Sequence, residues 1–178
     1  MPETGKALYA HLEQQRYAFL ERARDCSRLT LPHLIPDEGD NSAKKFVGAH
    51  QSVGARGVNN LSSALLLSLL PPNAPFFRFV IDPKAARTLE QMSPRAKSEA
   101  EQSLADMERS VMKEIEAQSV RVALFEALKQ LIVAGNVLLY FPDEGPMRVI
   151  RLDRYVVKRD PMGHVRKIVI KENVAPAV

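Results

Sequence analysis

Residues 51–70 read QSVGARGVNNLSSALLLSLL and contain the longest apolar run of the chain, residues 61–70. Ser52 is a good N-cap, and the pair Pro71 and Pro72 stops a helix, so this stretch predicts a helix from about Ser52 to Leu70. Its apolar residues form one stripe and then widen it: Val58, Leu61, Leu65, Leu69, Leu66, Leu67 and Leu70. We therefore expect a helix that is buried on most sides. The run is too short for a membrane span, which needs about 20 apolar residues.

Before this stretch, residues 6–27 have the pattern of a long amphipathic helix. Leu8, Leu12, Phe19, Ala23 and Cys26 fall close to one helical face, and charged residues fall elsewhere. Cys26 is therefore expected to be a small buried hydrophobe. Prolines end this helix, and the polar residues 37–45 have the composition of an exposed loop.

After residue 70, prolines force an extended path into residues 76–81, FFRFVI, which we predict to be a short strand. Asp82 before a proline and Ser93 before a proline each mark a helix start. Ser119 is expected to cap a further helix, which Gly135 closes.

The residue pattern changes from helical to β-rich after Gly135. Residues 136–141, 147–152, 155–159 and 165–171 are short β-rich runs separated by turn signals. Short connections between such strands favour an antiparallel meander. The fold class is therefore α+β: residues 1–135 mainly helical with a short strand near 76–81, and residues 136–178 an antiparallel β meander.

The chain carries no pattern that indicates an enzyme, a cofactor or a metal. The glycines of residues 48–57 lack a Gly-Lys-Ser/Thr ending, so we expect Gly54 and Gly57 to let a helix pack closely rather than to bind a nucleotide. The four histidines, His11, His33, His50 and His164, lie in different predicted elements, without zinc-motif spacing. Cys26 is the only cysteine, which excludes an intrachain disulfide. A hydrolase remains an alternative, but it would need a converging polar pocket.

The net charge of +4 permits contact with phosphates without requiring it. The N-terminus lacks the features of a secretory signal, so the chain is expected to stay in the cytoplasm where it is made. The most one-sided charge is late, where few acidic residues oppose Arg148, Arg151, Arg154, Lys158, Arg159, Arg166, Lys167 and Lys171. Strands that carry these residues could track phosphates, protect a sheet edge or meet an acidic partner, and the sequence does not decide among these.

Several long runs resemble the opening of the head-to-tail connector, or portal, proteins of short-tailed bacteriophages of the podovirus type. These runs are LERARDCSRLTLPHL at residues 20–34, the quoted stretch 51–70 followed by PPNAPFFRFVI, and VRVALFEALKQLIVAGNVLLY at residues 120–140 with RLDRYVVKRDPMGHV after it. The resemblance covers almost the entire chain and keeps the order of the blocks.

This resemblance implies a structural subunit of a dodecameric ring at one capsid vertex, with no catalytic activity and no cofactor. The implied partners are other portal subunits, capsid and scaffolding proteins, terminase, tail adaptor proteins and the double-stranded DNA that passes through the channel. The implied location is the portal vertex of the virion, with host cytoplasm during assembly. Family members are several times longer, so the resemblance implies only the outer, wing-like portion, and the stem, clip and crown would follow this chain.

A ring subunit makes a head-to-tail contact with its neighbour. Arg56, Asn59 and Asn60 are polar groups on a helix that is otherwise apolar enough to be buried, and buried amides and guanidinium groups need partners. We expect these residues to bond within the wing fold or across the subunit boundary. The alternatives are a DNA-binding module that uses the basic late strands, and a nonfunctional portal gene fragment.

Overall fold

The computed structural model describes residues 4–37, 39, 52–72, 74–143 and 145–174. The loop predicted over residues 37–45, and His50, lie largely or wholly outside these ranges. Within these ranges the chain forms five helices followed by four short strands, which confirms the α+β class. In chain order the helices are α1 (Gly5–Leu29), α2 (Val53–Leu69), α3 (Pro83–Met92), α4 (Pro94–Ala117) and α5 (Val120–Ala134). The strands are β1 (Leu138–Tyr140), β2 (Arg148–Ile150), β3 (Tyr155–Arg159) and β4 (Val165–Ile170), with a 3-10 turn, η1 (Leu152–Arg154), before β3.

Helix α1 joins two separate clusters of buried side chains. One contains Leu20 and Ala23 of α1 with Val58 of α2 and Val133 of α5, and the other contains Leu8 and Leu12 of α1 with Val156 of β3. The buried face of α1 includes Leu20 and Ser27, whereas Phe19 is 64% exposed and Cys26 is also exposed. The predicted burial of Leu8, Leu12 and Ala23 is confirmed, but that of Phe19 and Cys26 is wrong, because at these two places the buried face passes through the next residue, Leu20 and Ser27.

The predicted ends of the later helices agree with the structure. The Asp82 carboxylate accepts from the Lys84 amide at 3.2 Å, and the Ser93 hydroxyl accepts from the Arg95 amide at 3.1 Å. Gly135 ends α5 with a φ of 70°, a left-handed conformation that favours glycine. Ser119 does precede α5, but its side chain makes no cap hydrogen bond.

The strands form two antiparallel hairpins instead of the single predicted meander. Leu139 of β1 lies opposite Val149 of β2, and Val157 of β3 lies opposite Ile168 of β4. Strands β2 and β3 are not paired, because η1 turns the chain between them, so that β2 packs on α5 and β3 packs on α1.

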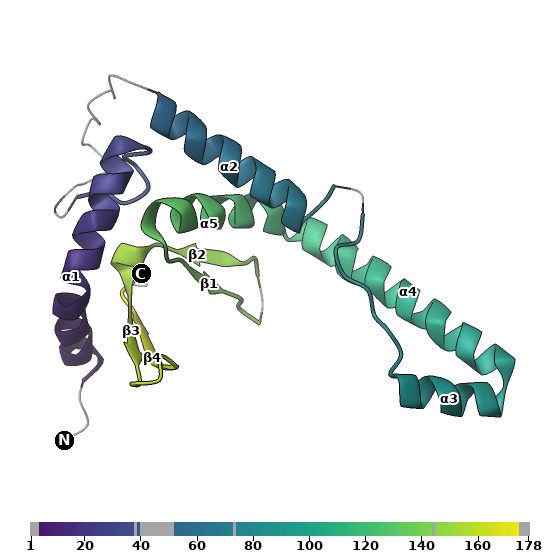
Figure 1. Cartoon of the computed structure of the whole chain (residues 1–178). Coiled ribbons are helices and arrows are strands. Elements are labelled where there is room, and N and C mark those ends of the chain that lie inside the picture. Colours follow the sequence, from purple (N-terminus) through teal and green to yellow (C-terminus); the bar gives the residue numbers. More distant parts are fainter. Residues whose placement is uncertain (1–3, 38, 40–51, 73, 144, 175–178) are drawn as a thin grey trace.

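Helices α3 and α4 form an arm that projects away from α1 and the hairpins (Figure 1). Residues 76–81 run along α4 in an extended conformation, but within the described ranges they pair with no strand. The strand predicted there is therefore not formed, since a strand needs a partner and the neighbour of this segment is a helix.

Helix α2 is the outermost element, with α5 on its inner side (Figure 1). Only Val58 and Ser62 are buried within it, whereas Leu61, Leu67 and Leu69 are 49%, 56% and 52% exposed. The prediction that α2 is buried on most sides is therefore wrong for this chain, because one helix covers only one side of it.

Candidate subunit interface

The outward side of α2 lacks the charge of an ordinary solvent-exposed helix. Val53, Arg56, Asn60, Ser63 and Leu67 follow the alternating three- and four-residue spacing of one helical face, and all are exposed. Arg56 is the only charged residue of the helix. Protein surfaces carry about 25–35% charged residues, whereas interface cores lose Lys, Asp and Glu but keep Arg. This outer face of α2, defined by these five residues, therefore has the composition of a protein interface.

The structure places all three residues predicted for a polar network on the surface of α2. The side chains of Arg56, Asn59 and Asn60 are exposed and make no hydrogen bond or ion pair to any described residue. The structure thus gives no support for a network inside the fold. The other alternative, that these residues bond across a subunit boundary, stays a prediction.

The inner side of α2 is fixed by close contacts, which hold its outer face in place. Ser62 is fully buried, and its hydroxyl donates to the Val58 carbonyl at 2.7 Å. A Cβ on Gly54 would lie 2.5 Å from the Leu29 carbonyl oxygen, so this glycine allows α2 to approach the end of α1. The predicted close packing is therefore found at Gly54, whereas a Cβ on Gly57 would have no neighbour within 4 Å.

Arg121 of α5 caps the C-terminal end of α2. Its guanidinium donates to the carbonyls of Leu70 and Pro71 at 2.6 and 2.9 Å. Carbonyls at the C-terminal end of a helix lack partners within the helix, and a cationic donor is a favourable partner for them. Helix α2 is therefore held at both ends.

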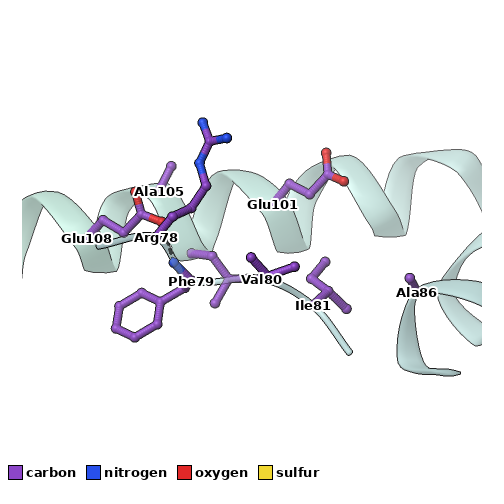
Figure 2. Close-up of a pocket in the computed structure, with 9 residues that line it drawn as sticks. Arg78, Phe79, Val80, Ile81, Ala86, Glu101, Ala105 and Glu108 are labelled. Atoms are coloured by element: carbon purple, nitrogen blue, oxygen red, sulfur yellow. Dashed lines mark hydrogen bonds between the residues drawn. The ribbon is translucent and has the colours of Figure 1, made fainter. Parts of the chain in front are cut away.

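A second open surface lies on the arm. Residues 78–81 and α4 enclose a hollow of about 440 Å³, which Glu101, Leu104 and Glu108 line from the helix side (Figure 2). The Phe79 amide donates to the Glu108 carboxylate at 2.6 Å, which fixes the segment against α4. The Phe79 ring points away from α4 (Figure 2) and forms an edge-to-face contact with Phe77, with ring centroids 5.4 Å apart.

The arm exposes much apolar surface around this hollow. Val80 is 80% exposed, Phe79 is 43% exposed and Met107 is 56% exposed. No described side chain of α3 or α4 is buried. Aromatic residues and Met are enriched in protein interfaces, so the arm also has the composition of a contact surface.

The late basic residues do not gather into one cationic surface. Most of them bond to nearby acceptors: Arg148 to Glu172 at 2.6 Å, Arg151 to Asp153 at 2.9 Å, Arg154 to Asp153 at 3.7 Å, Arg166 to Asp160 at 3.1 Å, and Arg159 to the Gly163 carbonyl at 2.9 Å. The Lys171 ammonium lies 5.7 Å from the centre of the Tyr9 ring. Lys158 and Lys167 lie opposite each other on the β3–β4 hairpin and are exposed.

The sequence model of the bacteriophage head to tail connecting protein family matches residues 3–177. The chain belongs to this family. Its curated relatives include the portal protein of Escherichia phage T7, 42% identical over 176 residues, and that of Enterobacteria phage T3, 43% identical over 175 residues. Each alignment covers 96% of this chain and 32% of the relative. The portal protein of Enterobacteria phage SP6 is 33% identical over 168 residues, 94% of this chain and 32% of the relative. The chain therefore spans about a third of the length of these relatives.

In this chain, the runs that carry the resemblance contain α2, the extended segment of the arm and α5, but not the helices α3 and α4 of the arm. Residues 51–70 contain α2, residues 71–81 contain the extended segment of the arm, and residues 120–140 form α5 and β1. The family model itself covers residues 3–177 and so does not single out these elements.

Sequence reasoning missed Arg16, which joins α1 to the segment around η1 and β3. The Arg16 guanidinium donates to the carbonyls of Leu152 and Tyr155, to the Asp153 carbonyl at 3.2 Å and to the Tyr9 hydroxyl at 3.2 Å. The Tyr9 hydroxyl in turn donates to the Asp153 carbonyl at 3.1 Å, and burial raises the pKa of Tyr9. The available signal was that Arg16 follows Leu8 and Leu12 at four-residue spacing, which places a cation on the apolar face.

The described part of the chain offers no place for a metal ion. It contains no group of three or more His, Cys, Asp or Glu side chains close enough to ligate one. Three of the four histidines lie within the described ranges. His11 is on α1, His33 follows α1, and His164 precedes β4. None of the described helices combines the length and apolarity needed to cross a membrane.

Proposed function

We propose that this chain is the wing-like outer portion of a structural portal subunit. The complete subunit forms the ring at one capsid vertex through which DNA is packaged and ejected, and to which the tail attaches. The observation that carries the proposal is the outer face of α2, where Arg56 is the single charged residue and which has the composition of a covered surface although it is exposed in the single chain. Family membership and the portal proteins among the relatives support it.

The proposed partners are those of a head-to-tail connector. They are other portal subunits, capsid and scaffolding proteins, terminase, tail adaptor proteins and double-stranded DNA. The proposed location is the portal vertex of the virion, with assembly in the host cytoplasm. The proposed role is mechanical, with no catalysis and no cofactor.

The exposed area of the chain supports a role in an assembly. The chain exposes 13257 Å², whereas a compact monomer of the same mass exposes about 8,700 Å². The difference exceeds the roughly 3,500 Å² that the residues outside the described ranges would expose even if fully extended. Specific protein interfaces bury about 1,200–2,000 Å² in total, so the excess is large enough for such a contact.

Arg56, Asn59 and Asn60 are the proposed polar contacts of this interface. An Arg side chain gives up its water more easily than Lys and offers five donors in a fixed geometry. An Asn side chain both donates and accepts. In our proposal these groups bond to the neighbouring subunit across the outer face of α2.

Sedimentation of the 178-residue chain over a concentration series tests the proposal. We expect the average mass to rise with concentration, and Arg56→Glu to weaken self-association about tenfold, because it places a negative charge in the contact. Arg22→Glu, which reverses an exposed charge on α1, is the matched control and should leave association unchanged. A chain that sediments as a monomer at every concentration would refute the proposed ring contact.

A further inference from the structure

The extended segment of the arm, although it is not a strand, has one edge whose backbone groups make no hydrogen bond among the described residues; we call it the strand edge because a strand could pair with it. In an extended chain the backbone groups of successive residues point to opposite sides. Because the Phe79 amide points to Glu108 of α4, the amides and carbonyls of Arg78 and Val80 point away from this contact. Within the described residues, neither of them makes a backbone hydrogen bond. The residues with the strongest β preference in the arm thus leave one edge open, and such an edge is a ready template for a partner.

The outer face of α2 offers groups that match this edge. The side-chain amide of Asn60 can donate to a backbone carbonyl and accept from a backbone N–H, and the exposed Asn59 beside this face can do the same. Leu67 is 56% exposed and provides apolar surface for Val80 and Phe79. Arg56, which has no ionic partner among the described residues, matches Glu101 in charge; Glu101 lines the hollow, forms no salt bridge among the described residues, and otherwise acts only through its charge on Lys97 of its own helix.

We propose that the strand edge at Arg78 and Val80 of one copy docks on the outer face of α2 in a second copy. This inference rests on the proposed ring function and names the two surfaces that meet. The lengths agree, because a helix of 17 residues is about 25 Å long and six extended residues span about 20 Å. The Arg56 guanidinium pairs with the Glu101 carboxylate across the contact.

The arrangement of the two surfaces favours a second copy as the occupant. We call α1, α2, α5 and the two hairpins the body of the chain. The arm leaves the body beyond the C-terminal end of α2 and projects away from α2, so it does not fold back on the α2 of its own chain (Figure 1). The two surfaces differ from each other, which gives a head-to-tail contact that each added copy can repeat. A repeated head-to-tail contact closes a ring when the rotation between copies permits it.

Disulfide trapping between two different chains tests this contact. Both chains carry Cys26→Ser, which removes the only native thiol; one also carries Asn60→Cys and the other Val80→Cys. Under mild oxidation we expect cross-linked dimers from the mixture and little cross-linking from either chain alone. A chain with both cysteines should give a ladder of dimers, trimers and larger species.

A charge exchange gives an independent measurement by sedimentation. Arg56→Glu and Glu101→Arg should each weaken self-association about tenfold, and mixing the two variants should restore association in hetero-dimers. Glu99→Arg, an exposed residue that does not line the hollow, is the control and should have no effect.

The outcomes separate this inference from the proposed function. If the chain associates but the mixed cysteines do not cross-link, the arm-to-α2 contact is overturned and the ring function stands. Self-linking of the Val80→Cys chain alone would also overturn it, because it would show a symmetric arm-to-arm contact. A chain that remains monomeric overturns the proposed ring contact and this inference with it.

Discussion

At the scale of single residues, Gly54 and Gly57 lie one helical turn apart in α2 but have opposite surroundings. A Cβ at Gly54 would lie 2.5 Å from a backbone oxygen of α1, whereas a Cβ at Gly57 would meet nothing within 4 Å. We expect Gly54→Ala to destabilise the chain by about 1–3 kcal/mol, because backbone has to move to make room. Gly57→Ala should instead stabilise it by up to about 1 kcal/mol, since Ala is the better helix former.

Urea denaturation followed by circular dichroism measures both changes. The two variants make the same chemical change in the same helix, so each is the control for the other. Equal effects of the two substitutions would contradict the close contact at Gly54.

Arg16 is a second residue whose surroundings predict a large effect. Arg16→Met keeps the apolar stem but leaves the carbonyls of Leu152, Asp153 and Tyr155 without their donor. Hydrogen bonds to charged groups contribute about 1.5–3 kcal/mol each, so we expect a loss of about 3 kcal/mol in the free energy of unfolding. The measurement is the same denaturation curve. Arg22→Met, at an exposed site on the same helix, should change it by less than about 0.5 kcal/mol.

At the scale of elements, local signals predicted the ends of helices better than the pairing of strands. The caps at Asp82 and Ser93 and the glycine at Gly135 act within a few residues, so their sequence neighbours are sufficient to place them. Residues 76–81 have strong β preference, yet their conformation depends on a contact between Phe79 and Glu108 of α4, 29 residues apart in the chain. Strand pairing is set by such distant contacts, which a sequence pattern does not contain.

The candidate site, like the fold, was predicted only in part from the sequence. The sequence picked out Arg56, Asn59 and Asn60 because they interrupt an apolar helix, but it did not show that this face is the exposed one. The arm was not predicted as a surface at all, because its exposure follows from how α4 leaves α5.

The arm should be the least stable element of the single chain. Since no described side chain of α3 or α4 is buried, its backbone hydrogen bonds can open without unfolding the body. We expect amides of α3 and α4 to exchange with deuterium roughly 100-fold faster than those of α5, whose Ala127 and Leu128 are buried. Hydrogen exchange with mass spectrometry measures this. Equal protection of the arm and α5 would show that the arm is stabilised by contacts that the single chain does not contain.

At the scale of the whole molecule, the body holds the chain together and the arm presents open surface. The body is held together by α1, which contributes to both buried clusters and is fastened to η1 through Arg16. The arm and the outer face of α2 remain open, and they are the parts that a neighbouring subunit would cover. Under the proposed ring contact, stability of the single chain and assembly would depend on different residues, and substitutions would separate them.

The charge distribution of the whole molecule gives a last prediction, which separates a connector portion from a DNA-binding module. Each phosphate contact adds about 0.9 to the slope of log affinity against log salt. Most late cations are bonded to nearby acceptors, and Lys158 and Lys167 are the exposed exceptions on the β3–β4 hairpin, so we expect weak binding to duplex DNA with a slope no steeper than about 2. Fluorescence anisotropy of a labelled duplex at several salt concentrations measures the slope. Lys158→Gln with Lys167→Gln should remove the remaining affinity, whereas Arg148→Gln should not. A slope near 6 would mean that the ion pairs open to bind phosphates, and it would favour the DNA-binding module.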